Sequence, residues 1–353
     1  MIQTRLPRSL FLLISLILLS ACSTLPIKQG VEMSNLYQHR WINTDKPHAN
    51  QSIKSVANFL SNYDVVFFGE LHSHPGVHLA QMQIFEAMYN LNPELSLSLE
   101  QFERDTQSTV DDYLAGEIGE KIMISKTRAW DNYQMSYRPL VEFSKHNKLP
   151  VVAANAPKSS VVCVGRLGLD YLQTLTPEDR ENVAVDIDIS DGSYRQKFMS
   201  FITNNASHGS TSDNKMSDMM KKMSERSYSA QVLRDDTMAE SIDNHLQRNP
   251  QRRVLHLNGV FHSSNFLGVV ERLQARNPAL KIAVIETVTL SENDDSWKTE
   301  ELESANLLLL VRHLPVAFIK HDNEVEWSKA ILKKRKESGI NCNIPIQASS
   351  DNQ

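Results

Sequence analysis

Two histidines in this chain stand three residues after a glycine, and each of these motifs directly follows an apolar run. Gly69-Glu70-Leu71-His72 follows the run 64–68, and Gly259-Val260-Phe261-His262 follows the run 253–257. A third apolar run, 95–99, ends at the lone acid Glu100. Two imidazoles beside carboxylates can bind a divalent metal or move a proton. We therefore take Glu70, His72, Glu100 and His262 as candidate catalytic or metal-binding residues, with hydrogen bonding to strand-end carbonyls as the structural alternative.

Two more histidines lie just beyond the first motif. His74 is a lesser candidate for the site and is interpreted mainly as a capping or solvent-exposed residue. His78 lies one helical turn after His74 and can share its face, so it is a lesser candidate for the same site. His256 falls inside an apolar run and is predicted to be a hydrogen-bonded core histidine.

The apolar runs predict the elements that must position these groups. Short runs at 64–68, 95–99, 150–154, 253–257 and 281–285 are typical of buried strands, and all but the last are followed by residues at helical spacing. Strands separated by helices predict an α/β fold with a mainly parallel sheet and flanking helices. Further strands are expected at 306–311 and 316–319. In such a sheet, ligands bind beyond the carboxyl ends of the strands, where the candidate residues are expected.

Residues 159–248 carry little strand signal and predict a smaller helical insertion, with helices at 194–204, 212–224 and 228–247. Four methionines in it fall at helical spacing on one face: Met216, Met219, Met220 and Met223. Such a face is either part of a core or a soft apolar lid or partner surface.

The N-terminus predicts export and lipidation. Residues 1–22 combine two early arginines with an apolar run of about half the roughly 20 residues that a membrane-spanning helix needs. Leu19-Ser20-Ala21-Cys22 resembles a lipobox, which implies acylation of Cys22 and attachment to a lipid bilayer. Ser23 in place of an acid favours the outer membrane, with the protein facing the periplasm or the cell surface.

These interpretations divide the chain into three parts after the signal segment. Residues 23–50 are interpreted as a tether without a regular element, residues 51–320 as the α/β domain with its insertion, and residues 321–353 as a charged helix and tail. Cys163 and Cys342 either pair in an oxidising compartment or remain free thiols. The net charge of −5 and the lack of a long basic run argue against a nucleic-acid partner.

Several separated motifs together resemble the ChaN family, the haem-binding, iron-regulated lipoprotein branch of the Tiki/TraB/erythromycin-esterase superfamily. The resemblance spans about residues 50–290 and rests on both glycine–histidine motifs, the Leu99-Glu100 end, the 137–143 and 152–157 segments, and Ala230-Gln231 with Arg234-Asp235. It implies a parallel α/β core with a smaller helical domain, a haem pocket associated with dimerisation, and a role in haem or iron uptake alongside an outer-membrane haem receptor. It also implies that Glu70, His72, Glu100 and His262 match the catalytic or metal set of the esterase and protease branches.

Haem requires an apolar slot, an axial donor and cations for its propionates. Trp130, Tyr133 and Tyr137, followed by Arg138, form an aromatic segment with an adjacent cation. The resemblance makes a tyrosine ligand plausible, while the residues alone do not separate Tyr133 from Tyr137, and methionine donors are a weaker alternative. The preferred hypothesis is a dimeric haem-binding lipoprotein. The alternative is a metal-dependent or esterase-like hydrolase that uses the strand-end residues.

Overall fold

The computed structural model describes residues 33–49, 51–206, 218–290, 299–337 and 339–342 of the 353-residue chain. The predicted signal segment, the first part of the tether, Met216 and the tail beyond residue 342 lie outside these ranges. No helix in the described ranges is long and apolar enough to cross a membrane.

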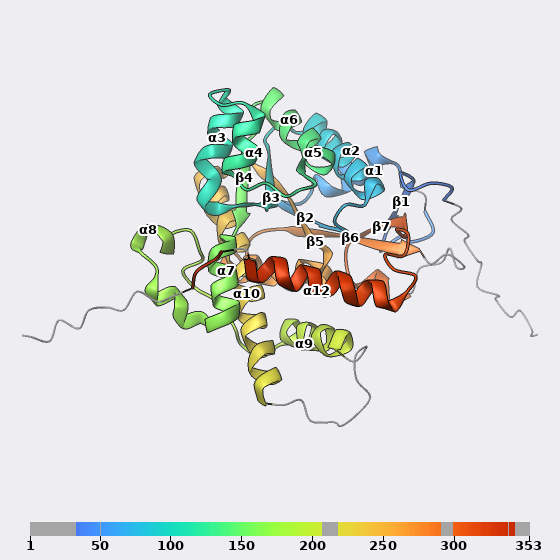
Figure 1. Cartoon of the computed structure of the whole chain (residues 1–353). Helices are drawn as coiled ribbons and strands as arrows, with labels where there is room; N and C mark the ends of the chain where they lie inside the picture. Colours follow the sequence, from blue (N-terminus) through green and yellow to red (C-terminus); the bar gives the residue numbers. More distant parts are fainter. Residues whose placement is uncertain (1–32, 50, 207–217, 291–298, 338, 343–353) are drawn as a thin grey trace, which may run out of the picture.

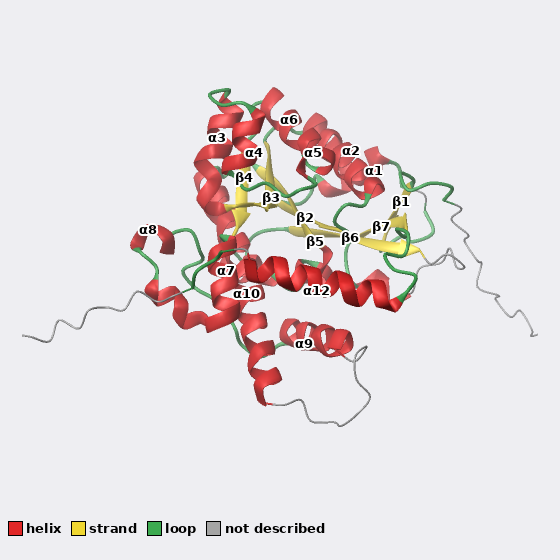
Figure 2. Ribbon diagram, in the orientation of Figure 1, coloured by secondary structure: helices red, strands yellow, loops and turns green. Residues whose placement is uncertain are grey.

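A mostly parallel sheet forms the centre of the structure (Figures 1 and 2). The described residues contribute seven strands in the order β1-β7-β6-β2-β5-β3-β4. Only β1 runs antiparallel, against β7. The bounds are β1 His39–Asn43, β2 Val65–Glu70, β3 Leu95–Glu103, β4 Val151–Asn155, β5 Arg253–Gly259, β6 Ile282–Leu290 and β7 Leu307–Arg312. The predicted α/β class with a mainly parallel sheet is confirmed.

The central strands are buried on both sides, because helices cover both faces of the sheet. One face is covered by α1 Ile53–Leu60, α2 Pro75–Leu91, α3 Gln107–Ala115, α4 Glu120–Lys126, α5 Tyr133–Ser136 and α6 Arg138–His146. The other carries α7 Lys158–Leu167, the second half of α10 Asp218–Arg248, and α11 Val269–Arg276. Alternate residues of one strand serve the two layers: Phe68 packs under the first group and Phe67 under the second.

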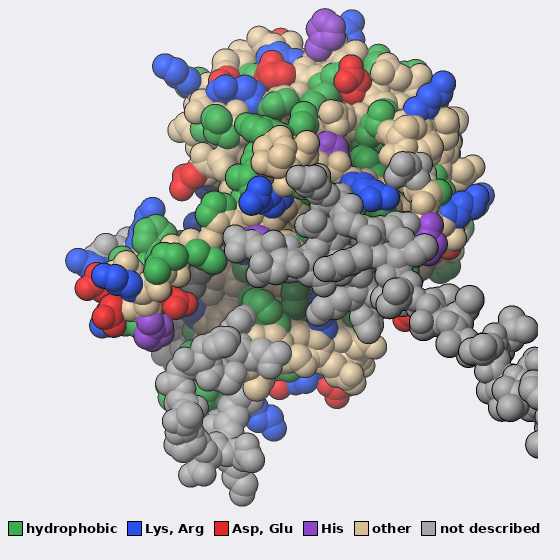
Figure 3. Space-filling model, turned by 90° about the vertical axis from the view of Figure 1, so that its right-hand side faces the viewer, with side chains coloured by type: hydrophobic (Ala, Val, Ile, Leu, Met, Phe, Trp, Pro, Cys, Tyr) green, Lys and Arg blue, Asp and Glu red, His purple; other side chains and the backbone are tan. Residues whose placement is uncertain are grey.

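The remaining elements lie between or beyond these layers. They are α8 Pro177–Arg180, α9 Ser193–Ala206, α12 His321–Glu337, and the 3-10 turns η1 Arg104–Thr106, η2 Leu169–Thr174, η4 Val260–His262, η5 Ser264–Phe266 and η6 Thr299–Glu303. Helix α9 packs on α10 through its own small core of Tyr194, Phe198, Tyr228 and Val232. Positive and negative side chains are interspersed over the face shown in Figure 3.

Three predictions of local structure are wrong. The segment 316–319 is not a strand: Val316 and Ile319 are exposed, and the outer edge of β7 is already paired with β1. β1 itself lies inside the predicted tether, where Trp41 and Ile42 enter the core. The helices predicted at 212–224 and 228–247 are one continuous helix from Asp218 onward, because no helix-breaking residue separates them.

The methionine face is exposed rather than part of a core. Met219, Met220 and Met223 lie in the first turns of α10 with exposed side chains, so the core interpretation is wrong for these three residues. Cys163 and Cys342 form a disulfide, which decides the alternative that the sequence left open.

Candidate functional site

The carboxyl ends of β2, β5 and β3 are neighbours in the sheet, so the residues that follow these strands meet at one edge. Glu70 ends β2, His262 follows β5, and Glu100 lies where the register between β3 and β4 shifts. Because all the expected residues meet there, we call Glu70, His72, Glu100 and His262 the strand-end cluster.

Glu70 is a fully buried carboxylate surrounded by donors. Its Oε1 accepts hydrogen bonds from the Tyr137 hydroxyl and, at 3.3 Å, from Gln101 Nε2, while its Oε2 accepts from Gln81 Nε2 at 2.6 Å. His72 Nδ1 lies 2.7 Å from Oε1. Burial raises the pKa of Glu70, but the hydrogen bond from His72 and the charges of His78 and His72 outweigh it and lower that pKa. The carboxylate is therefore held in its charged form.

His72 is the accessible member of this pair, with 45% of its side chain exposed. Burial of the remainder lowers the pKa of His72, but the hydrogen bond and the charge of Glu70 outweigh it and raise that pKa. The Trp130 ring stands edge-on to the imidazole, with centroids 5.0 Å apart. On the other side His72 fits against Gly259, where a Cβ atom would stand only 2.9 Å from His72 Nε2. The glycine of the second motif thus makes room for the histidine of the first.

The second histidine has its own carboxylate partner. His262 Nδ1 lies 2.5 Å from Asp235 Oδ1, and the Tyr194 hydroxyl donates to Asp235 Oδ2 at 2.5 Å. On its other side, His262 Nε2 lies 3.5 Å from Glu100 Oε1. Burial lowers the pKa of His262, but the charges of Asp235 and Glu100 outweigh it and raise that pKa.

Glu100 links the two halves of the cluster. Its Oε2 accepts the backbone N–H of Gly259 at 2.7 Å, and its backbone carbonyl accepts Asn155 Nδ2 at 3.0 Å. Two imidazoles, each oriented by its own carboxylate, therefore flank one buried carboxylate. This arrangement can accept and return protons from a polarised water or hydroxyl.

Asp235 and Tyr194 were not among the residues predicted to form the site. Asp235 reaches it from the middle of α10, and Tyr194 from α9. The spacing of Gln231 and Asp235 by four residues places them on one helix face, and Gln231 Nε2 also lies 3.2 Å from His262 Nδ1. That spacing is the sequence signal that could have pointed to Asp235, whereas Tyr194 carries no such signal.

The two lesser candidates hold the first loop in place. His74 is the N-cap of α2, as predicted: its Nδ1 accepts the N–H of Gly76, and its Nε2 donates to the carbonyl of Arg312 at 2.6 Å. His78 bonds through Nδ1 to Gln81 Oε1, so it orients a donor to Glu70. His256 is a buried core histidine bonded to Ser98 Oγ, also as predicted.

The residues proposed as haem ligands do not offer an open donor in this structure. Tyr133 and Tyr137 are buried, and the Tyr137 hydroxyl is committed to Glu70. Burial raises the pKa of both phenols, which disfavours the tyrosinate form. Arg138 is paired with Glu120 rather than directed into a cavity. As placed, these three residues do not fit a porphyrin without local rearrangement.

A divalent metal likewise has no prepared site. Among the residues that the structure describes, no group of three or more His, Cys, Asp or Glu side chains is placed to hold a metal ion. The cluster is organised as hydrogen-bonded pairs, in which the ring nitrogens facing the carboxylates are already engaged.

The mostly parallel sheet, with two histidine–carboxylate pairs at its carboxyl edge, defines an α/β protein with a polar strand-end cluster. The family model described as "Haem-binding uptake, Tiki superfamily, ChaN" matches residues 56–273, well over half of the sequence. The chain therefore belongs to the ChaN haem-binding uptake family of the Tiki superfamily.

One solved structure supports the fold, and a second is more distant. ChaN of Campylobacter jejuni, described with cofacial haem binding, matches with a TM-score of 0.59 and 17% identity over 78% of this chain and 97% of that chain. An erythromycin esterase, EreC, matches with a TM-score of 0.41 and 12% identity over 72% of this chain and 78% of its own. Comparison with curated protein sequences finds no match.

Proposed function

We propose that this chain is a haem-binding protein of haem or iron uptake, attached to the outer membrane through an acylated Cys22. The observation that carries the proposal is membership of the haem-binding uptake family, supported by a fold that spans 97% of the C. jejuni ChaN chain described with cofacial haem. The lipobox-like sequence at Cys22 supports the proposed attachment of the protein to the outer membrane.

Exposed apolar side chains on α9 and α10 offer a surface for the porphyrin. Phe201, Met219, Met220 and Met223 are all exposed, and we call them the methionine surface. A porphyrin face is large and apolar, and a methionine thioether is a known donor to haem iron. The exposed side chains of Lys221 and Lys222 in the same turns of α10 can pair with propionates. Figure 1 shows α9 and the start of α10 projecting together away from the sheet.

A single exposed surface covers only one face of a porphyrin. A second copy of the chain, bringing its own methionine surface, would cover the other face and remove both apolar surfaces from water. This supports the dimer in our proposal, and the cofacial haem of C. jejuni ChaN is compatible with it. We propose an outer-membrane haem receptor as the partner that supplies the haem.

The tyrosine ligand remains part of the proposal as the competing donor. Ligation by Tyr137 would require its hydroxyl to leave Glu70, and ligation by Tyr133 would require the core around it to open. The two donor sets therefore make different predictions.

The test is a titration of the purified chain carrying Cys22→Ser with ferric haem, followed by the visible spectrum. Replacing Met219, Met220 and Met223 with Ala should weaken binding about tenfold or more, which corresponds to about 1.4 kcal/mol. The matched control is Met135→Ala, because Met135 is also an exposed methionine but lies on α5. If the double variant Tyr133→Phe with Tyr137→Phe loses haem binding and the methionine variant does not, the haem site is formed by tyrosine and not by the methionine surface. Unsaturable binding by the unaltered chain would refute haem binding itself.

The strand-end cluster supports a second candidate function, hydrolysis. The specific observation is that half-exposed His72 bonds to buried Glu70, which orients the imidazole and stabilises its protonated form. A neutral His72 can take a proton from water, and the Asp235–His262 pair can supply one to a leaving group.

This second function is tested with a chromogenic ester such as p-nitrophenyl acetate. His72→Ala combined with His262→Ala should abolish hydrolysis and leave haem binding unchanged. Equal hydrolysis by the double variant and by the unaltered chain would remove the cluster from any enzymatic role.

A further inference from the structure

Helix α12 has an unusual setting for a helix of 17 residues. From His321 to Lys334 its side chains are exposed, except those of Val325 and Ile331, which are half-buried. Trp327 and Leu332 are 59% and 55% exposed. A helix of this length is marginally stable in water by itself, so packing that is this shallow contributes little to holding it. Its two ends must therefore restrain it.

The first anchor lies at the carboxyl end of β7. The chain leaves β7 at Arg312, whose carbonyl accepts the hydrogen bond from His74 Nε2 in the loop that also carries His72. The connection from this point to the start of α12 is only eight residues, 313–320. The start of α12 is thus tied to the loop of the strand-end cluster.

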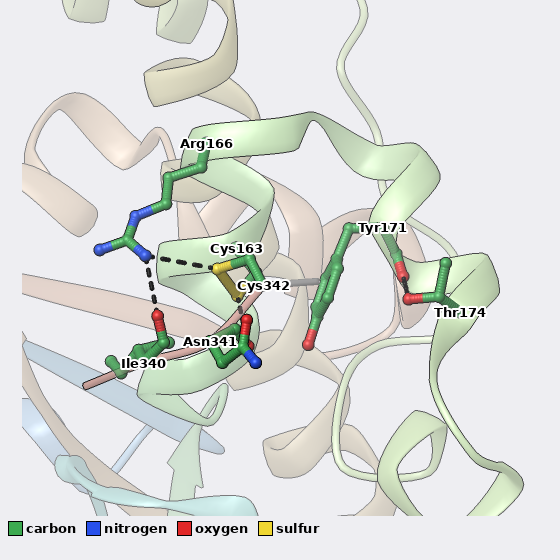
Figure 4. The surroundings of a disulfide bond; sticks show 7 residues. All are labelled: Cys163, Arg166, Tyr171, Thr174, Ile340, Asn341 and Cys342. Atoms are coloured by element: carbon green, nitrogen blue, oxygen red, sulfur yellow. Dashed lines mark hydrogen bonds between the residues drawn. A yellow bond between two sulfur atoms is a disulfide. The ribbon is translucent and has the colours of Figure 1, made fainter. Parts of the chain in front are cut away.

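The second anchor is the disulfide. Beyond α12, Cys342 is bonded to the buried Cys163 in α7, and Arg166 Nη1 donates to the carbonyl of Ile340 at 2.9 Å (Figure 4). Helix α7 begins directly after β4, at the carboxyl end of that strand. Asn155, the last residue of β4, donates to the backbone carbonyl of Glu100. The segment after α12 is thus fixed to the helix that follows β4, the strand next to the one that carries Glu100.

The two anchors define where α12 runs. β7 and β4 are separated by five strand spacings, with β6, β2, β5 and β3 between them, which amounts to about 24 Å. Seventeen helical residues span about 25 Å. Figure 1 shows α12 crossing in front of the sheet from the β7 side to the α7 side. β7 ends at the carboxyl edge, and Cys163 lies in the second turn of α7, the helix that begins at this edge, so the path between the anchors runs along the side of the sheet that carries Glu70, His72, Glu100 and His262.

We propose that α12 is a strap across the carboxyl edge of the sheet, fastened by the Cys163–Cys342 disulfide, and that it restricts access to His72 until the disulfide is reduced. The restraint of α12 by the disulfide does not depend on any proposed activity. Its use as a gate rests on the proposed role of the strand-end cluster as a hydrolytic site.

Release requires a dithiol reductant. One of its thiolates attacks the accessible Cys342 sulfur, and the S–S electron pair leaves with Cys163 as a thiolate, which then takes up a proton. The second thiol of the reductant displaces Cys342, so the protein disulfide becomes two thiols and the reductant becomes a disulfide. Arg166 Nη1, 3.6 Å from Cys342 Sγ, stabilises the negative charge that develops when that thiolate is released in the second step.

Hydrogen exchange followed by mass spectrometry tests the fastening. In the oxidised full chain, the α12 amides should be protected, and reduction or Cys342→Ser should lower that protection by about tenfold or more. Amides of β2 and β5 serve as the internal control for folding and should not change. Equal exchange of α12 in the oxidised and reduced protein would overturn the strap. Reductant added to the Cys342→Ser chain should have no effect.

Carbethoxylation of His72 by diethyl pyrocarbonate, at one fixed pH, tests the gate without requiring any activity. Opening the disulfide should speed modification of the peptide containing His72 by about threefold or more. If reduction speeds hydrogen exchange in α12 but leaves the rate of His72 modification unchanged, the disulfide restrains α12 but does not control access to His72. If ester hydrolysis is absent in both states but both of these readouts change, the hydrolytic function fails and the strap remains.

Discussion

Gly259→Ala is the substitution that most selectively perturbs the first histidine pair. Gly259 has φ −57° and ψ 138°, a conformation that any residue adopts, so the backbone should accept alanine. The added Cβ would stand 2.9 Å from His72 Nε2 and 3.7 Å from Glu100 Oε2. The imidazole must then move, and the 2.7 Å contact between His72 Nδ1 and Glu70 Oε1 must lengthen.

The magnitude depends on pH, because His72 is charged only below its raised pKa. The Glu70–His72 interaction stabilises the folded state fully below the unfolded pKa of about 6.5, and this stabilisation is lost as the pH rises through the folded pKa. A hydrogen bond to a charged group contributes about 1.5–3 kcal/mol, and solvent screening at the half-exposed His72 reduces this to about 1 kcal/mol. The entropic gain from replacing glycine, about 0.4–1 kcal/mol, is the same at every pH.

The assay is urea unfolding of Gly259→Ala and the unaltered chain at about pH 5.5 and about pH 9. We expect the unfolding free energy of Gly259→Ala, measured relative to that of the unaltered chain, to be about 1 kcal/mol lower at about pH 5.5 than at about pH 9. An NMR titration should show the pKa of His72 falling toward its ordinary value. Gly165→Ala is the control, because its Cβ would meet only Ala230 Cβ at an ordinary 3.6 Å. A pH-independent difference, with an unchanged His72 pKa, would refute the placement of His72 against Gly259.

Two further predictions rest on buried side chains, and a third rests on the lipobox-like sequence at Cys22. Tyr194→Phe removes a hydroxyl that donates to buried Asp235, so urea unfolding should show a loss of about 1–3 kcal/mol, and an unchanged stability would contradict that bond. Burial lowers the pKa of His256 to about 3, so stability present above about pH 6.5 should fall by up to about 1.4 kcal/mol per pH unit on acidification toward pH 3. Replacing His256 with Gln should make that decline shallower, and an equal decline would assign it to other groups. Cys22→Ser should move the protein from the membrane fraction to the soluble fraction on cell fractionation, whereas continued membrane association would exclude lipid anchoring.

The sequence could predict the sheet because its strands are short apolar runs that end in polar residues. The same rule placed Glu70, His72, Glu100 and His262 at one edge, since parallel strands carry their following loops to the same side. The capping role of His74 and the buried position of His256 were also predicted correctly, the latter from its apolar neighbours.

Features that depend on distant partners could not be predicted in this way. β1 has only Trp41 and Ile42 as an apolar signal, and its pairing with β7 supplies the rest. Tyr194 carries no sequence signal for the site, because only the fold brings its hydroxyl to Asp235. The hydrogen bond of the Tyr137 hydroxyl is made to Glu70, which lies 67 residues earlier in the chain.

The central claim, that this chain binds haem in a dimer, is tested most directly by sedimentation velocity during a titration with ferric haem. We predict a saturable haem spectrum and, over the same range of haem concentration, a shift of the sedimentation coefficient from monomer to dimer. Binding that does not saturate, with an unchanged sedimentation coefficient, would contradict it.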